Sequence, residues 1–139
     1  MKEYLSSSYW EVYNKGIKLA GALRAEKELF YVSNKMSSLN GFQRRNFFSA
    51  LNNFSVIHKN FYHNIINGIN DSYFEARREA INLIPLIIDK LDNKDEIRKM
   101  ILKRADCFFE RWEVKCSIIK ILPLIMAEEE FYQFTKKYQ

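Results

Sequence analysis

The sequence repeats itself at nearly regular intervals, and this repetition limits the possible folds more than any other feature. A short stretch recurs in which Ser, Asn or Glu is followed by an aromatic ring, and the four rings are Trp10, Phe42, Phe74 and Trp112. The intervals between successive rings are 32, 32 and 38 residues. Intervals of this size are typical of proteins in which each copy forms one supersecondary unit. The sequence therefore predicts one domain built from four copies, roughly 8–39, 40–71, 72–109 and 110–139.

Each copy opens with the pattern of a helix start. Ser or Asn accepts a hydrogen bond from a free amide of the first turn, and Glu or Gln three residues later bonds the amide of the cap residue. This capping-box spacing occurs at Ser8/Glu11, Asn40/Gln43 and Ser72/Glu75, whereas Glu110/Glu113 keeps only the acidic half. We therefore expect four helices over 8–24, 40–57, 72–91 and 110–126.

Apolar residues recur at spacings of three and four along these segments, which is typical of a helix with one face toward a core. Pro85 and Pro123 occupy matching places in the last two copies and predict a shared bend. A shorter second helix is expected in each copy, over 24–36, 59–69, 94–105 and 128–138. Since no stretch alternates strictly between polar and apolar residues, the predicted fold is all-α with about eight helices.

The third and fourth copies resemble HEAT repeats. The segment from Asp71 to Ala80, Asp-Ser-Tyr-Phe-Glu-Ala-Arg-Arg-Glu-Ala, is similar to the acidic turn and Val-Arg-x-x-Ala helix start of that family. Trp112-Glu-Val-Lys115 is similar to the same start, with Lys for Arg. The resemblance covers 71–126 well, whereas 1–70 departs from it with Tyr13 at the basic position and Phe48 at the small one. It implies a right-handed α-solenoid of about four helix pairs whose inner helix row binds a partner.

Composition narrows the class of protein further. The 139 residues are 47% hydrophobic and 28% charged, which is typical of a folded globular chain. The longest uncharged apolar run, 81–88, is too short to span a bilayer, and no apolar signal core follows Met1. Two cysteines are too few for a disulfide scaffold. We therefore expect a cytoplasmic protein without a membrane partner.

The sequence contains no catalytic or metal-binding pattern. His58 and His63 are five residues apart, which places them on different helix faces, and Cys107 and Cys116 lack a second pair. Paired acids lie near helix ends, where the helix dipole accounts for them. No phosphate-binding glycine loop or nucleophile motif is present. We expect no catalytic residue, no metal and no cofactor, and interpret the protein as a non-enzyme.

The basic residues allow two interpretations. The net charge is +5, and corresponding helix starts carry Arg44, Arg45, Arg77, Arg78, Arg111 and Lys115. Stacked repeats would align these residues in a row that binds an acidic surface or phosphates. Alternatively, HEAT-like arginines bond an acidic turn in their own or a neighbouring repeat, and the spacing of Asp71 and Arg77 fits that structural role.

Three functions follow from these interpretations. The leading one is a non-enzymatic scaffold or adaptor that binds another protein along the inner helix row. The first alternative is nucleic-acid binding on the basic row, which would resemble the HEAT-like DNA alkylation-repair glycosylases. The second alternative is a regulatory or inhibitor protein that docks on an acidic enzyme.

Aromatic residues give further expectations. We expect Trp112 to wedge between repeats, and we expect one ring of each adjacent pair, Phe47/Phe48 and Phe108/Phe109, to reach a seam between repeats or the surface. The last helix carries an apolar stripe of Phe131, Phe134 and Tyr138. This stripe either packs back on the helix over 110–126 or forms an end interface, through which the protein would self-associate or continue into missing sequence.

Overall fold

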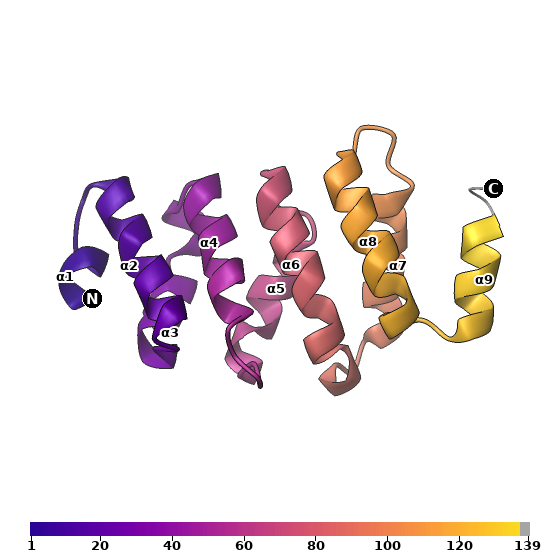
Figure 1. The fold of residues 1–139 in the computed structure, drawn as a ribbon, viewed down its shortest axis with the longest axis horizontal. Coiled ribbons are helices and arrows are strands. Elements are labelled where there is room, and N and C mark those ends of the chain that lie inside the picture. The colour runs from indigo at the N-terminus through magenta and orange to yellow at the C-terminus, as the bar shows by residue number, and fades with distance from the viewer. Residues whose placement is uncertain (137–139) are drawn as a thin grey trace.

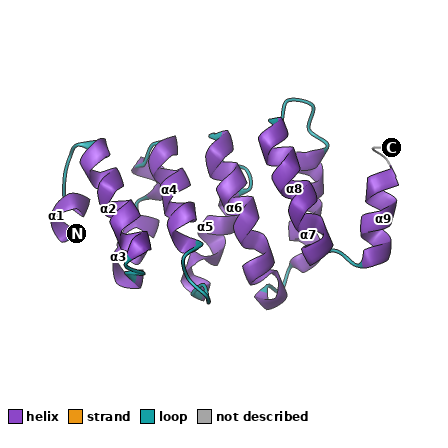
Figure 2. Cartoon of the chain, viewed as in Figure 1, coloured by secondary structure: helices purple, strands orange, loops and turns teal. Residues whose placement is uncertain are grey.

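The computed structural model describes residues 1–136, and every regular element in that range is helical (Figures 1 and 2). The all-α prediction is therefore confirmed. The described range holds nine α-helices, one more than the eight expected, because the unpredicted α1 (Lys2–Leu5) precedes the first copy. The same range also holds three short 3-10 helices, η1 (Met36–Ser38), η2 (Lys59–Phe61) and η3 (Ile88–Lys90).

The helices form two layers, as Figure 1 shows. The first layer is a row of helices that run in the same direction, and neighbours in the row contact one another. It comprises α2 (Trp10–Ala22), α4 (Gly41–Leu51), α6 (Phe74–Ile87) and α8 (Trp112–Ile125). The second layer lies behind this row and comprises α3 (Glu26–Ser33), α5 (Tyr62–Gly68) and α7 (Lys94–Ala105). The last helix, α9 (Glu128–Lys136), contacts α8 at the end of the row.

The predicted helix boundaries hold best for the last two copies and least for the second. The helix expected over 40–57 ends at Leu51, and residues 52–58 are turns and loop before η2. Pro85 and Pro123 lie inside α6 and α8, as their matching positions suggest.

Only one of the predicted capping boxes forms. Asn40 Oδ1 accepts from the amide of Gln43 and Gln43 Oε1 accepts from the amide of Asn40, both at 2.9 Å. The boxes predicted at Ser8/Glu11 and Ser72/Glu75 are wrong, because the N-caps of α2 and α6 are Tyr9 and Tyr73, one residue after the serines. In the third copy, Asp71 Oδ1 accepts from the amide of Tyr73 at 2.9 Å, so the acidic turn organises the helix start instead of the serine.

The core lies between the layers and in the seams of the first layer. Both Phe47 and Phe48 are buried, so neither reaches the surface. Phe47 packs on Phe61 with ring centroids 6.0 Å apart, and Phe48 lies against Gly68, which also faces Ala80 of α6, in agreement with the expected seam position. A Cβ atom at Gly68 would lie 2.6 Å from Phe48 Cζ. Both rings are covered because α4 lies in the interior of the row, with neighbours on both sides and the second layer behind.

Arg24 occupies a backbone conformation that favours glycine. It follows the last turn of α2 with φ of 51°, and the amides of Arg24 and Ala25 bond the carbonyls of Gly21 and Ala20. This is a Schellman helix end, in which the left-handed residue is usually glycine. Replacing Arg24 by Gly is expected to raise the free energy of unfolding by about 0.5–1 kcal/mol, measured by urea denaturation. Arg24→Ala keeps the unfavourable φ and should give no such gain; equal effects of the two variants would contradict the explanation.

Candidate functional site

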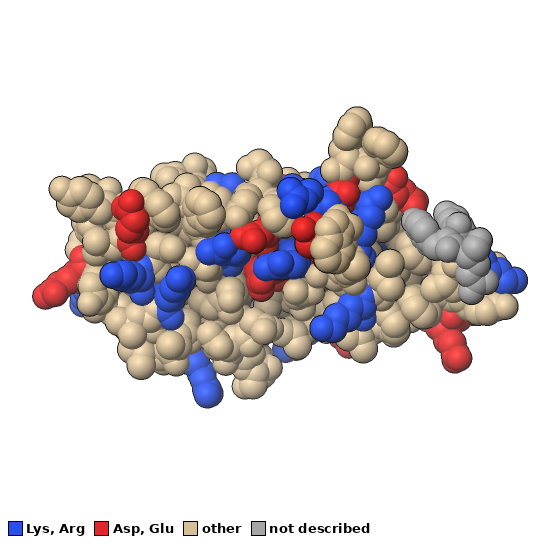
Figure 3. Space-filling model, turned by 45° about the horizontal axis from the view of Figure 1, so that its top comes forward, with Lys and Arg blue, Asp and Glu red and all other residues tan. Residues whose placement is uncertain are grey.

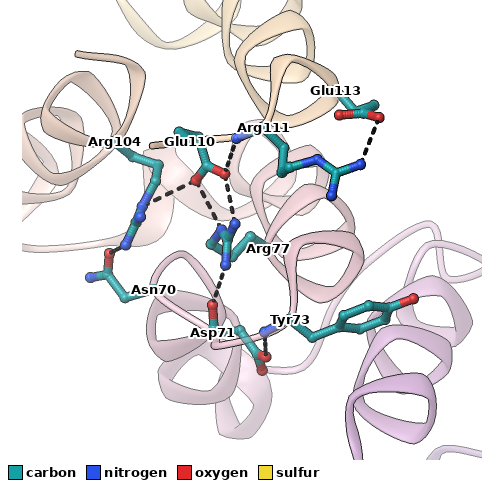
Figure 4. A network of polar contacts seen from close by, with 8 residues as sticks. All are labelled: Asn70, Asp71, Tyr73, Arg77, Arg104, Glu110, Arg111 and Glu113. Atoms are coloured by element: carbon teal, nitrogen blue, oxygen red, sulfur yellow. Dashed lines mark hydrogen bonds and ion pairs between the residues drawn. The ribbon is translucent and has the colours of Figure 1, made fainter. Parts of the chain in front are cut away.

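The best-defined polar cluster joins α6 to the start of α8. Arg77 donates from Nε and Nη2 to the two carboxylate oxygens of Glu110, at 2.9 and 2.7 Å, and from Nη1 to the carbonyl of Asp71 at 2.8 Å. The Glu110 side chain is fully buried. Figure 4 shows that Arg104 approaches the same carboxylate from α7, with 3.4 Å between Nε and Oε2.

The same arrangement joins α4 to the start of α6. Arg44 donates from Nε and Nη2 to the carboxylate of Asp71, at 2.8 and 3.0 Å, and from Nη1 to the carbonyl of Leu39 at 2.6 Å. Arg44 is therefore the structural counterpart of Arg77, although alignment by the aromatic rings pairs Arg77 with Arg45. The register shifts by one because α4 begins at Gly41, one residue before its ring, whereas α6 begins at its ring.

Asp71 and Glu110 each perform two tasks in these clusters. Each receives a bidentate arginine from the preceding first-layer helix, and each accepts from a backbone amide at the start of the next, from Tyr73 at 2.9 Å and from Arg111 at 2.7 Å. We call this pair of arginine–carboxylate bonds the turn-carboxylate ladder. Charge-assisted bidentate bonds fix orientation as well as distance. The ladder therefore sets how α6 lies on α4 and how α8 lies on α6.

The other predicted basic residues are largely paired as well. Arg45 bonds Glu75 at 2.6 Å, Arg78 contacts Glu79 at 3.3 Å, and Arg111 contacts Glu113 at 3.4 Å. Within residues 1–136, Lys115 makes no ion pair. Basic and acidic side chains are accordingly intermixed over the middle of the molecule in Figure 3.

Glu75 is a carboxylate in this region whose pKa is clearly shifted. The hydroxyl of Tyr73 donates to Glu75 Oε2 at 2.5 Å, and this bond, followed by the bond from Arg45, lowers the pKa of Glu75 below its ordinary value of 4.5. The same bond raises the pKa of Tyr73 above its ordinary value of 10.0. Both shifts favour the pair of an ionised carboxylate and a neutral phenol at neutral pH.

This pair predicts how stability depends on pH. Because the folded pKa of Glu75 is depressed, its contribution is present above the ordinary pKa and is lost as the pH falls through the lowered folded value. Replacing Glu75 by Gln should therefore reduce the loss of unfolding free energy between pH 5 and acidic pH, measured by urea denaturation across that range. An unchanged acid dependence would contradict the assignment, and Glu128→Gln, at an exposed position, is the matched control.

Two clefts open along the second layer. One, of about 380 Å³, lies between α3 and α5, and its lining includes Asn34, Asn64 and Asn67. The next, of about 310 Å³, lies where α5 ends beside α7, and its lining includes Asn70 and Lys103. The sequence reasoning missed these asparagines; the signal was their recurrence near the ends of the first two second-layer helices.

Trp112 does not wedge between repeats. Its ring is 70% exposed, which corrects the expectation, and Trp112 is the first residue of α8. Phe108 and Phe109 are both 87% exposed in the loop that rises above the row in Figure 1. Both rings of that pair reach the surface, rather than one of them, because neither belongs to a helix.

The C-terminal stripe divides between core and surface. Phe134 is buried in the core and Phe131 is half-buried against it, whereas Tyr138 lies outside the described residues. The alternative in which this stripe packs back on the preceding helix therefore accounts for Phe134.

No group of three or more His, Cys, Asp and Glu side chains within residues 1–136 could hold a metal ion. None of the helices described there is long and apolar enough to cross a bilayer.

Comparison with protein-family models, curated proteins and solved structures gave no match. The functional proposals below therefore rest on the geometry of this chain.

Proposed function

We propose that the protein is a non-enzymatic interaction module, a small HEAT-like α-solenoid that binds a partner protein along the helix row formed by α3, α5 and α7. The observation that carries this proposal is the pair of neighbouring clefts on the second layer, of about 380 and 310 Å³. One cleft is lined by Asn67 in the last turn of α5, and the other by Asn70, which follows that helix.

The chemistry of these clefts suits a polypeptide. Side-chain amides both donate and accept hydrogen bonds, as the backbone of an extended peptide does. Asn34 and Asn67 are exposed, and Lys103 adds a positive charge beside Asn70. A segment lying across both clefts could exchange backbone hydrogen bonds with the asparagines and place an acidic side chain near Lys103.

Nucleic-acid binding is less well supported, because the arginines expected to contact phosphates already have carboxylate partners. Arg44 and Arg77 are held bidentately, and Arg45 bonds Glu75. A phosphate chain would have to displace these carboxylates instead of releasing mobile counterions.

The test is quantitative co-purification of the tagged protein from its native lysate, with nuclease treatment. We expect a protein partner to be recovered after nuclease treatment. The amount recovered should be at least about tenfold lower with the Asn67→Ala/Lys103→Ala variant. The matched control Asn82→Ala/Lys120→Ala changes exposed residues of the first layer and should retain the partner. Material that disappears with nuclease would favour the nucleic-acid alternative, and equal recovery with both double variants would contradict the proposed surface.

A further inference from the structure

A chain of aromatic rings crosses the starts of the first-layer helices. Trp10 of α2 stacks on Phe42 of α4 with centroids 5.8 Å apart and planes inclined by 18°. Phe42 meets Tyr73 edge-on at 5.4 Å, and Tyr73 meets Phe74 of α6 at 5.5 Å. We call Trp10, Phe42, Tyr73 and Phe74 the aromatic rim. Its first two members are 43% and 45% exposed, although rings this large are usually more deeply buried.

The rim is held rigid by its surroundings. The Tyr73 hydroxyl bonds Glu75, and the Tyr73 ring lies so close to Gly41 that a Cβ atom there would be 2.7 Å from Tyr73 Cγ. The Arg45 guanidinium lies 5.5 Å from the Phe42 ring centroid. A cleft of about 440 Å³ opens beside these rings, lined in part by Trp10, Asn40 and Tyr73. Rigid rings lose little conformational entropy when a ligand binds.

The charge around the rim narrows the class of ligand. Arg44 is paired with Asp71, Arg45 with Glu75, and the guanidinium of Arg111, which lies 4.1 Å from the Phe74 ring centroid, with Glu113. Each cation beside the rim therefore has its own carboxylate. Neither a phosphate chain nor an acidic peptide finds an uncompensated positive charge there, so the rim suits an uncharged segment.

The free hydrogen-bond donors of the cleft narrow the class of ligand further. Within residues 1–136, neither Trp10 Nε1 nor Asn40 Nδ2 donates a hydrogen bond to a protein acceptor. A polyproline II segment has unpaired carbonyl oxygens, and its prolines have no N–H group to satisfy. Proline rings also pack well on aromatic surfaces, and aromatic-lined grooves are a recurring site for such segments.

We propose that the aromatic rim binds an uncharged, proline-rich segment of a partner protein in the polyproline II conformation. The rings contact the prolines, and Trp10 Nε1 and Asn40 Nδ2 donate to carbonyls of the segment. This surface lies at the starts of the first-layer helices and uses none of the second-layer asparagines. An experiment can therefore contradict binding at the rim without contradicting the proposed function, and can contradict the proposed function without contradicting binding at the rim.

The test uses the intrinsic fluorescence of Trp10 in the full chain, with Trp112→Phe removing the other indole. The probe is an acetylated, amidated peptide of three Pro-Pro-Leu-Pro repeats, compared with a peptide in which every proline is Ala and with an oligothymidylate. We expect the proline peptide to cause a saturable change in Trp10 fluorescence, with a Kd below about 1 mM, and the other two probes to cause none. No saturation, equal binding of the alanine peptide, or binding of the oligothymidylate instead would overturn the proposal.

A variant pair locates the binding. Phe42→Ala should raise the Kd of the proline peptide at least about tenfold. Phe109→Ala, which removes a more exposed ring outside the rim, should change this Kd less than about twofold. Amide chemical shifts of the unsubstituted protein provide a readout without a substitution. They should move on peptide addition around residues 9–10, 40–42 and 72–74, and shifts confined to other regions would contradict the rim as the site.

Discussion

Replacing Glu110 by Ala is expected to lower the free energy of unfolding by about 3–5 kcal/mol, measured by urea denaturation. The carboxylate is fully buried and neutralises Arg77, whose side chain is only 12% exposed, and it also contacts Arg104. Its removal leaves two guanidiniums near the core without their counterion and frees the amide of Arg111 at the start of α8. Breaking a buried pair on one side carries this large cost because the remaining charge stays desolvated.

Asp95→Ala is the matched control for Glu110→Ala. Asp95 also bonds an arginine, Arg98 at 2.7 Å, but its side chain is 90% exposed. Exposed pairs contribute little, so this loss should stay below about 1 kcal/mol. Similar losses for the two variants would mean that Glu110 is not the buried anchor described above.

Replacing Phe48 by Ala is also expected to lower the free energy of unfolding by about 3–5 kcal/mol. The ring is 1% exposed and fills the space against Gly68, where the glycine leaves no side chain to move into the cavity. The loss would be measured by thermal and urea unfolding monitored by circular dichroism.

Phe108→Ala removes the same atoms from a ring that is 87% exposed, and should change the unfolding free energy by no more than about 0.5 kcal/mol. A cost for Phe108→Ala as large as that for Phe48→Ala would place Phe108 in the core and contradict the fold described for the loop before α8.

The sequence predicted the helical elements well because their signal is local. Apolar spacing and helix-start residues located all eight helices of the four copies, and the matching prolines fall inside α6 and α8. The helix starts were predicted less well, since Ser72 and Asp71 can both serve the first turn of α6. Only the spatial position of Arg44, which holds the Asp71 carboxylate in place, decides between them.

The surface was harder to predict, because exposure depends on packing between distant segments. Phe47 and Phe48 carry the same local signal as Phe108 and Phe109, yet the first pair is buried and the second is exposed. Likewise, the basic residues at the helix starts stand out in the sequence, whereas the partner of Arg77, Glu110, lies 33 residues away and was interpreted only as part of a helix start. The aromatic rim was missed as a surface because its rings fit a helix core equally well.

The central claim is that turn carboxylates tie α6 to α4 and α8 to α6 and thereby make Arg44 and Arg77 structural. A double-mutant cycle with Arg77→Met and Glu110→Gln tests it most directly, with unfolding free energies of the unsubstituted protein, both single variants and the double variant. We expect a coupling energy of at least about 1.5 kcal/mol, with the double variant more stable than the single effects predict. Single effects that add within about 0.5 kcal/mol would show that the two side chains act independently and would contradict the claim.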